Sequence, residues 1–370
     1  MRIRSVLAGL LGVALAAHAF AAQPPAPSST AAAASSTAAP PPAAAADGAI
    51  AFPAATIPFS AYASPEALNR FRQILVEGKQ APDFSKGVEP ARKFNDAINA
   101  NRVERMKKLY RVKLSSPVIG GVATDVVEPA DGVARDNKYR VLINLHGGGF
   151  LWGAHSGALV ESIPVAAVGR IKVISIDYRQ GPEHTFPAAS DDVEAVYKEL
   201  LKTYPAANIG IYGCSAGGIL TGEVVARLIH DGIKVPGAIG MFCSGIVAPA
   251  GDSSYVSPVL SGDAIGSGPV SIHRLPYFAG ASETDPLVLP ANDPAMLKKF
   301  PPTLLISGTR DFAMSSLLQS QRLLTRAGVE VDLHLWDGMW HSFFSDPELP
   351  ESKQAYAVMA AFFDKHLGKN

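Results

Sequence analysis

The sequence predicts an α/β fold in which a mostly parallel central sheet is covered by helices on both faces. Short apolar runs rich in Val and Ile recur along the chain, and segments with helical periodicity separate them. Clusters of Gly, Pro and Asp mark the junctions between these segments. Strands that are continuously apolar and alternate with helices are typical of a parallel sheet buried between two helical layers.

Seven strands are expected, near residues 121–128, 140–146, 171–177, 208–213, 237–243, 302–307 and 329–336. Five helices are expected between or after them, near residues 156–169, 188–203, 216–231, 313–327 and 351–366. Two more helices precede the first strand: one opens at Ser64-Pro65-Glu66, and the other runs from about Glu89 to Tyr110. Residues 245–300, rich in Gly, Pro and Ser, predict an irregular excursion near the active edge of the sheet.

The first 50 residues have the pattern of a targeting segment and a linker. Two arginines precede the apolar run 5–17, which is too short to span a bilayer comfortably. Ala-Phe-Ala at 19–21 offers small residues at a cleavage site, so we expect residues 1–21 to be a signal peptide. The mature protein would then be periplasmic or secreted, without stable insertion in the membrane; an uncleaved anchor is the alternative. Residues 22–50, mostly Ala, Pro, Ser and Thr, are expected to form a disordered spacer.

The composition is that of a globular protein with a large core. Apolar residues make up 48% of the 370 residues and charged residues 18%. Lys plus Arg and Asp plus Glu both number 33, so charge gives no reason to expect nucleic acid as a partner. The two cysteines, Cys214 and Cys243, are too few for a disulfide framework. We expect two buried free thiols, and a single bridge between neighbouring strands is the alternative.

The first chemical signal is Gly213-Cys214-Ser215-Ala216-Gly217, whose position between a predicted strand and a predicted helix strengthens an otherwise common pattern. A serine at the apex of such a sharp turn has a strained backbone, and the flanking glycines avoid collisions. The N-terminus of the following helix provides positive potential beside the reacting oxygen. We therefore expect Ser215 to be a nucleophile.

A second signal is His146-Gly147-Gly148-Gly149-Phe150, directly after the strand near residues 140–146. Three consecutive glycines allow the backbone to turn its N–H groups toward a substrate oxygen. Together with the N–H that follows the nucleophile, such donors form an oxyanion hole. A flexible loop without this role is the alternative.

A nucleophilic serine needs a base, and the base needs an orienting acid. His341 follows the last predicted strand in a loop, which places it at the carboxyl edge of the sheet, where open α/β folds bind their ligands. Asp311 follows the preceding strand at the same edge. We favour Asp311 as the acid over its rivals Asp285 and Asp337, and His341 as the base.

These motifs make the chain resemble the hormone-sensitive-lipase-like, or bacterial family IV, carboxylesterases of the α/β-hydrolase fold. The residues that carry the resemblance are His146–Phe150, Asp177-Tyr178-Arg179, Pro182-Glu183-His184, Phe186-Pro187-Ala188-Ala189, Gly213–Gly218, Thr309-Arg310-Asp311 and His341 with Phe343. It covers roughly residues 115–366. Two features depart from the family pattern. Cys214 stands where Asp or Thr is usual. The acid of the family commonly lies in a D-P-L-x-D sequence, whereas here Asp285-Pro286-Leu287 lies well upstream of Asp311.

The resemblance implies a triad of Ser215, Asp311 and His341 and an oxyanion hole formed by Gly148, Gly149 and Ala216. It also implies a helical N-terminal cap, here residues 51–112, on a catalytic domain of residues 113–370. The implied activity is hydrolysis of short-to-medium-chain carboxylic esters. A lactonase, amidase or peptidase with the same triad is the alternative, and a non-catalytic ligand-binding relative is a lesser one.

The expected partner is a small-molecule ester, and no cofactor or metal is expected, because the chain lacks the usual metal and nucleotide motifs. The oligomeric state is left open. We expect Glu183 and His146 to brace the Gly-rich loop. Four side chains are candidates for lining the substrate pocket, with simple packing as the alternative for each: Phe150, Trp152, Met339 and Trp340.

Overall fold

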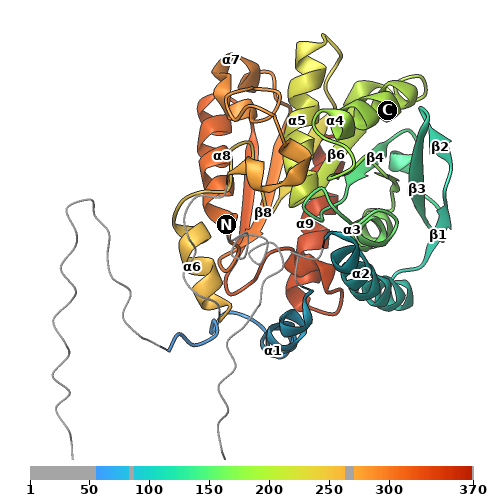
Figure 1. Ribbon diagram of the computed structural model, residues 1–370. Helices are drawn as coiled ribbons and strands as arrows, with labels where there is room; N and C mark the ends of the chain where they lie inside the picture. Colours follow the sequence, from blue (N-terminus) through green and yellow to red (C-terminus); the bar gives the residue numbers. More distant parts are fainter. Residues whose placement is uncertain (1–55, 83–86, 263–270, 369–370) are drawn as a thin grey trace, which may run out of the picture. The chain divides into compact units, whose positions relative to one another are not determined.

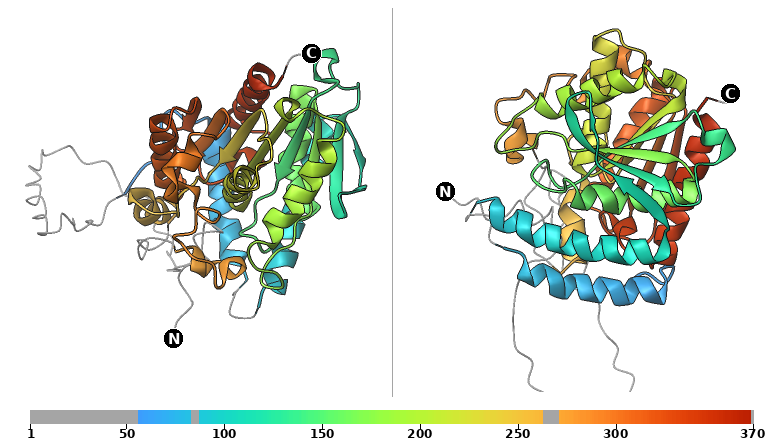
Figure 2. Two further views of the ribbon diagram at one scale, coloured as in Figure 1. Left: turned by 90° about the horizontal axis from the view of Figure 1, so that it is seen from above. Right: turned by 90° about the vertical axis from the view of Figure 1, so that its right-hand side faces the viewer.

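The apolar runs of the sequence form a twisted sheet whose central strands are parallel (Figures 1 and 2). The structure is a computed structural model, and it describes residues 56–82, 87–262 and 271–368. The described residues from Ser60 onward form one compact unit. The predicted signal peptide and spacer, residues 1–50, lie outside the described residues.

Nine strands are found in the described part of the chain, with the order β1-β3-β5-β4-β6-β7-β8-β9 and β2 paired with β3. β3 pairs in antiparallel fashion with β1, β2 and β5, and the neighbours from β5 to β9 are all parallel. The strands are β1 (Val112–Ser115), β2 (Val118–Ile119), β3 (Val122–Pro129), β4 (Val141–Leu145), β5 (Lys172–Ile176), β6 (Ile209–Cys214), β7 (Ala238–Phe242), β8 (Thr303–Gly308) and β9 (Val331–Trp336).

The helices cover both faces of this sheet and the edge that carries the predicted site. They are α1 (Pro65–Glu77), α2 (Glu89–Leu109), α3 (Ser156–Gly169), α4 (Ala188–Leu200), α5 (Ala216–His230), α6 (Asp252–Leu260), α7 (Pro294–Leu297), α8 (Met314–Arg326) and α9 (Pro350–His366). The largest apolar cluster joins one face of the sheet to α4, α5 and α8. α3 and α9 pack against each other on the opposite face.

The predicted fold class is confirmed, and each predicted strand and helix has a counterpart within a few residues. The sequence did not predict β1, β2, α6 or α7. β1 and β2 are short and largely exposed, so they lack the apolar run that marks a buried strand. α6 and α7 lie within residues 245–300, the segment expected to be irregular.

The register of the parallel strands brings the predicted site residues to one edge. Leu145 at the end of β4 pairs with Gly213 in β6, and Cys214 pairs with Phe242 at the end of β7. Because parallel strands share their carboxyl edge, the segments after β4, β6, β8 and β9 all begin there. These segments carry the Gly-rich loop, Ser215, Asp311 and His341.

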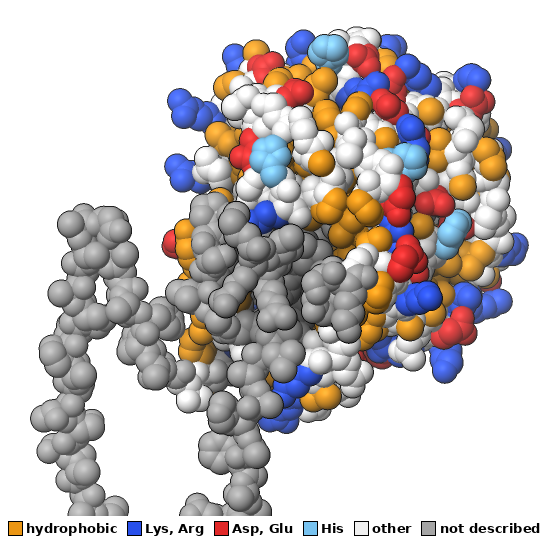
Figure 3. Space-filling view, in the orientation of Figure 1, with side chains coloured by type: hydrophobic (Ala, Val, Ile, Leu, Met, Phe, Trp, Pro, Cys, Tyr) orange, Lys and Arg blue, Asp and Glu red, His pale blue; other side chains and the backbone are white. Residues whose placement is uncertain are grey.

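Where described residues are visible in Figure 3, charges of both signs are mixed. Lys and Arg side chains are interspersed there with Asp and Glu. This agrees with the equal numbers of basic and acidic residues in the sequence. Among the described helices, we find none whose length and apolar character would suit a bilayer crossing.

α1 and α2 are fastened to the rest of the protein by a buried charge cluster centred on Asp346. The Asp346 carboxylate is 1% exposed and lies just after the 3₁₀ turn Phe343–Ser345. Arg70 of α1 approaches its Oδ1 atom to 2.9 Å, and Arg105 of α2 approaches the same atom to 3.0 Å. Arg102 lies 3.7 Å from Oδ2. Burial alone would raise the pKa of Asp346, but the three arginines hold it below its usual value.

Replacing Asp346 with Asn is expected to lower the free energy of unfolding by about 3–5 kcal/mol, because it removes the buried carboxylate that three partly buried arginines share. Chemical denaturation at neutral pH measures this change. The matched control is Glu348→Gln: Glu348 also pairs with Arg105, but its side chain is 46% exposed, so the expected loss is below about 1 kcal/mol. Equal losses in the two variants would contradict the central role of Asp346.

Candidate active site

Ser215 occupies a strained turn between β6 and α5. Its backbone has φ 57° and ψ −120°, a region that residues with side chains rarely adopt. The turn is closely packed, since a Cβ atom on Gly213 or Gly217 would collide with the carbonyl oxygen of Leu145. The Ser215 N–H donates to Phe242 O of β7 at 2.8 Å. The glycines of the motif are therefore required by space, as the sequence predicted.

The Gly-rich loop after β4 lies beside Ser215, and both line the same pocket. Gly148 and Gly149 have φ of 121° and 62°, and a Cβ on Gly148 would collide with Trp152. Among the described residues, the N–H groups of Gly148, Gly149 and Ala216 have no acceptor in the protein. These three N–H groups are available for an oxygen atom of a ligand.

Asp311 and His341 form a short hydrogen-bonded pair. His341 Nδ1 lies 2.8 Å from Asp311 Oδ1, and the Asp311 side chain is fully buried. The carboxylate also accepts hydrogen bonds from the Ala313 N–H and the Ser307 hydroxyl, at 2.9 and 2.7 Å. Burial alone would raise the pKa of Asp311, but His341 and these donors lower it below its usual value. The acid is therefore held ionised beside the imidazole, as an orienting acid must be.

The rival acids bind elsewhere. Asp285 accepts a hydrogen bond from the Leu287 N–H at 2.8 Å. Asp337 accepts hydrogen bonds from the hydroxyls of Thr309 and Ser60, which suits a residue that fixes the turn before His341. Asp311 is therefore the candidate acid that the structure pairs with His341.

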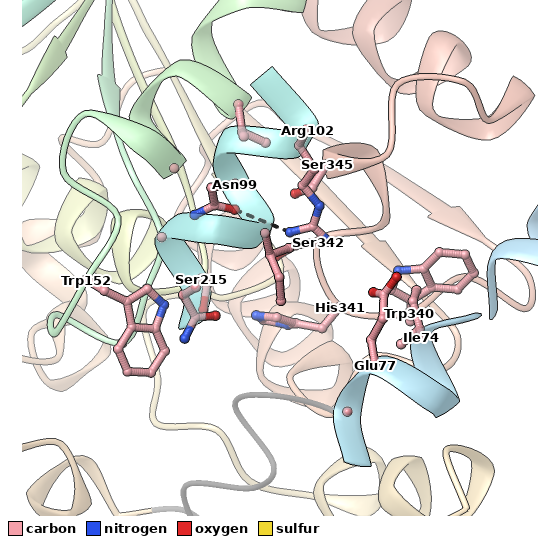
Figure 4. Close-up of a pocket in the computed structure, with 18 of the residues that line it drawn as sticks. Ile74, Glu77, Asn99, Arg102, Trp152, Ser215, Trp340, His341, Ser342 and Ser345 are labelled. Atoms are coloured by element: carbon pink, nitrogen blue, oxygen red, sulfur yellow. Dashed lines mark hydrogen bonds between the residues drawn. The ribbon is translucent and has the colours of Figure 1, made fainter. Parts of the chain in front are cut away.

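Ser215 and His341 line the same pocket, which has a volume of about 230 Å³. The Gly-rich loop forms one wall, and residues of α1 and α2 also line the pocket. Figure 4 shows Ser215 and His341 at this pocket, together with Trp152 and Trp340. Trp152 and Trp340 therefore lie where the sequence analysis placed them as candidate pocket residues.

Phe150 and Met339 differ from that expectation. Both side chains are fully buried, and neither lines the pocket. Phe150 stacks on Tyr277 with ring centroids 4.5 Å apart and meets Phe278 edge to face at 5.1 Å. Phe150 therefore packs beneath the loop, and the backbone of Met339 closes against Gly308. The structure supports the alternative for these two residues, which was simple packing.

Glu161 of α3 is a site residue that sequence analysis missed. Its carboxylate accepts hydrogen bonds from the Gly147 N–H at 2.7 Å and from Asn144 Nδ2 at 3.0 Å. It also accepts from the Cys214 N–H. Glu161 therefore joins the residue before Gly148 to the residue before Ser215. A lone Glu within a helix expected only to cover the sheet gave no signal of this role.

The bracing expected of Glu183 occurs through an intermediate arginine. Glu183 forms a bidentate ion pair with Arg92 of α2, at 2.7 and 2.8 Å. Arg92 in turn donates to the carbonyl oxygens of Leu151 and Gly181, at 2.8 and 3.0 Å. Glu183 thus positions an arginine that holds the far end of the Gly-rich loop.

His146 contacts its own loop directly, because its Nδ1 lies 2.8 Å from Gly147 O. Its ring stacks on Tyr178 at 4.4 Å. Burial lowers the pKa of His146 to about 4, so the imidazole is neutral at physiological pH. The side chain therefore acts as a packed, uncharged support for the loop.

Cys214 and Cys243 are both buried free thiols beneath the site, as expected. Cys214 Sγ lies 2.9 Å from the Ser342 hydroxyl, and the Ser342 N–H donates to Cys243 Sγ at 3.2 Å. Cys243, Asp311 and His341 are the group among the described residues whose ligand atoms lie close enough to hold a metal ion. Burial raises the pKa of the Cys243 thiol, which opposes the thiolate that a metal would need.

The comparisons with known proteins agree with this geometry. A family described as the alpha/beta hydrolase fold matches residues 142–345, which is more than half of the chain. The chain is 26% identical over 255 residues to an acetyl-hydrolase of Streptomyces hygroscopicus, covering 68% of this chain and 82% of that protein.

Two solved structures extend the likeness to the fold. The crystal structure of esterase E25 has a TM-score of 0.76 and 29% identity, covering 86% of this chain and 99% of that one. An esterase from the bacterial hormone-sensitive lipase family has a TM-score of 0.71 and 26% identity, covering 83% of this chain and all of that one. The chain belongs to the α/β-hydrolase fold family. The resemblance to the hormone-sensitive-lipase-like esterases is confirmed.

Replacing Glu161 with Gln is expected to lower kcat on the order of 10²-fold, because an amide NH₂ would face backbone donors and displace the Gly-rich loop. Burial raises the pKa of Glu161 from near 4.5 to about 7, although its hydrogen bonds favour the ionised form. Protonation of Glu161 as the pH falls through 7 removes an acceptor. Wild-type kcat should therefore decrease as the pH falls near 7, and the contribution of Glu161 to this decrease should be absent in Glu161→Gln. Steady-state kinetics between pH 5 and 9 measure both effects.

Ser162→Ala is the matched control on the same helix, since Ser162 bonds Asn144 and Ala158 but neither side of the turn at Ser215. We expect its kcat to stay within a few-fold of wild type. A Glu161→Gln enzyme with unchanged kcat and an unchanged pH profile would contradict the positioning role.

Proposed function

We propose that this protein is a serine carboxylesterase that hydrolyses short-to-medium-chain carboxylic esters through an acyl-enzyme. The observation that carries the proposal is the ordered pair of Asp311 and His341 at the pocket that also holds Ser215. Esterases and an acetyl-hydrolase among the similar proteins support the same activity.

The mechanism follows from the positions of these groups. His341, oriented through Nδ1 by Asp311, removes the proton of Ser215 as the serine oxygen attacks the ester carbonyl. The N–H groups of Gly148, Gly149 and Ala216 stabilise the oxyanion. His341 then protonates the leaving alcohol, and water hydrolyses the acyl-enzyme through the same groups.

A lactonase, amidase or peptidase would use the same triad, and no observation in the structure favours one of them. A non-catalytic ligand-binding protein would not need the short contact between Asp311 and His341. A chain-length series of esters, assayed beside lactones and amides, separates these reactions. The proposed function requires the esters to be the faster substrates.

Replacing Ser215 with Ala is expected to abolish hydrolysis of p-nitrophenyl acetate and butyrate, because the variant lacks the nucleophile. The remaining rate should be at least about 10³-fold below wild type. Circular dichroism and thermal unfolding would check that the variant is folded. Activity at the wild-type level in a folded Ser215→Ala protein would refute the mechanism.

We also infer export of this protein, on the support of the sequence pattern at residues 1–21. The mature protein is then expected to begin near Ala22 in the periplasm or the medium. Mass spectrometry of the exported protein tests this, and a chain that retains Met1 would rule out cleavage.

A further inference from the structure

One part of the pocket is polar in a way that a plain aliphatic ester does not explain. Asn95, Asn99 and Arg102 of α2 follow one another at spacings of four and three residues, so they share a helix face. All three line the pocket, as do Ser342 and Ser345. Figure 4 shows Asn99 and Arg102 joined by a hydrogen bond, with Ser342 and Ser345 beside them.

Arg102 has weak partners within the protein. Its Nη1 lies 3.4 Å from Asn99 Oδ1, and its Nη2 lies 3.7 Å from Asp346 Oδ2, beyond hydrogen-bond distance. Its Nε is buried without a hydrogen-bond partner. A guanidinium has five N–H donors, so most of those on Arg102 are uncommitted. Asp346 meanwhile has shorter contacts with Arg70 and Arg105.

The other charged side chains that line the pocket are engaged at short distance. Glu77 accepts from Arg70 at 2.7 Å, and Glu161 accepts from the Gly147 N–H at 2.7 Å. Arg310 donates to Leu260 O at 2.9 Å, and its guanidinium lies over the Phe71 ring. Arg102 therefore differs from these three in the length of its polar contacts, which are 3.4 and 3.7 Å.

Asn99 is held as loosely as Arg102. Its Nδ2 lies 3.5 Å from the Ser156 hydroxyl, and the same hydroxyl donates to Asp96 at 2.7 Å. An alkyl chain against this face of α2 would displace water and leave the amide and guanidinium donors without acceptors, which costs free energy. An oxygen acceptor on the substrate would satisfy them.

We propose that Arg102 and Asn99 form a subsite for a carboxylate carried by the ester substrate. A carboxylate suits this site because it matches the planar fork of a guanidinium and accepts two N–H groups at once. The apolar wall residues Phe71, Trp152 and Phe312 would contact the intervening carbon chain. The substrate class is therefore a half-ester of a dicarboxylic acid, with the free carboxylate on the acyl side, or an O-acylated hydroxy acid, with the free carboxylate on the alcohol side. This inference rests on the proposed esterase function.

The test compares esters of similar length that differ at the distal end. Monomethyl adipate, methyl 6-hydroxyhexanoate and methyl heptanoate place a carboxylate, a hydroxyl or a methyl group on the acyl side. 6-Acetoxyhexanoate and hexyl acetate make the same comparison on the alcohol side. Proton release at constant pH gives kcat/KM for each. We expect the wild-type enzyme to prefer the carboxylate over the alkyl ester at least about tenfold on one of the two sides.

Arg102→Met should abolish this preference, by lowering kcat/KM for the carboxylate ester and raising it for the alkyl ester. Arg102→Lys, which keeps the charge, should retain part of it. The matched control is Arg105→Met: Arg105 lies one turn away and also pairs with Asp346, but it does not line the pocket. We expect Arg105→Met to keep the wild-type ratio between the two esters, even if its stability falls.

Two results would overturn the subsite. One is a wild-type enzyme that prefers the alkyl ester on both sides. The other is an Arg102→Met variant that changes every ester by the same factor, as loss of an anchor for α2 would do. Failure to hydrolyse any ester, by contrast, would reject the proposed function itself and the subsite with it.

Discussion

The close contact between the carbonyl oxygen of Leu145 and the turn at Ser215 is the constraint on which the site depends. β4 and β6 are adjacent parallel strands, and no side chain fits between Leu145 and the two glycines that flank the turn. The chain after β4 must then leave the sheet beside the serine. There the N–H groups of Gly148 and Gly149 lie exposed together with that of Ala216 at the start of α5. One close backbone contact thus positions both the proposed nucleophile and the proposed oxyanion donors.

Buried carboxylates surround this core, and the donors around each one determine its effect. Asp311 has two neutral donors as well as His341, so it remains ionised and orients the base. Glu161 has backbone and amide donors but no cationic partner, so burial raises its pKa to about 7. In the proposed mechanism, one carboxylate therefore supports the charge that develops on His341, and the other supports the geometry of the N–H groups that would bind the oxyanion. The same residue type serves two purposes because its partners differ.

The sequence predicted the elements that are apolar on both faces and the three residues at the carboxyl edge, because both leave local patterns. Ser215 and Gly148 lie in turns that only particular residues can form, so their neighbours in sequence reveal them. Glu161 and Asp346 leave no such pattern, since their partners are 14 to 276 residues away in the chain. Phe150 was misplaced for a related reason: its side chain packs under the loop against Tyr277, a contact created by the segment that the sequence left irregular. Tertiary contacts, rather than local propensity, determined these positions.

The position of Asp346 has a consequence for how the protein can be altered. Four residues separate it from His341, and the 3₁₀ turn Phe343–Ser345 lies among them. The contacts that hold α1 and α2, which line the pocket, and the proposed base His341 therefore lie on the same short peptide. A protein engineer who exchanges α1 and α2 for those of a relative must transplant this peptide too. The interchangeable module of this fold is larger than its first two helices, and its boundary lies near the C-terminus.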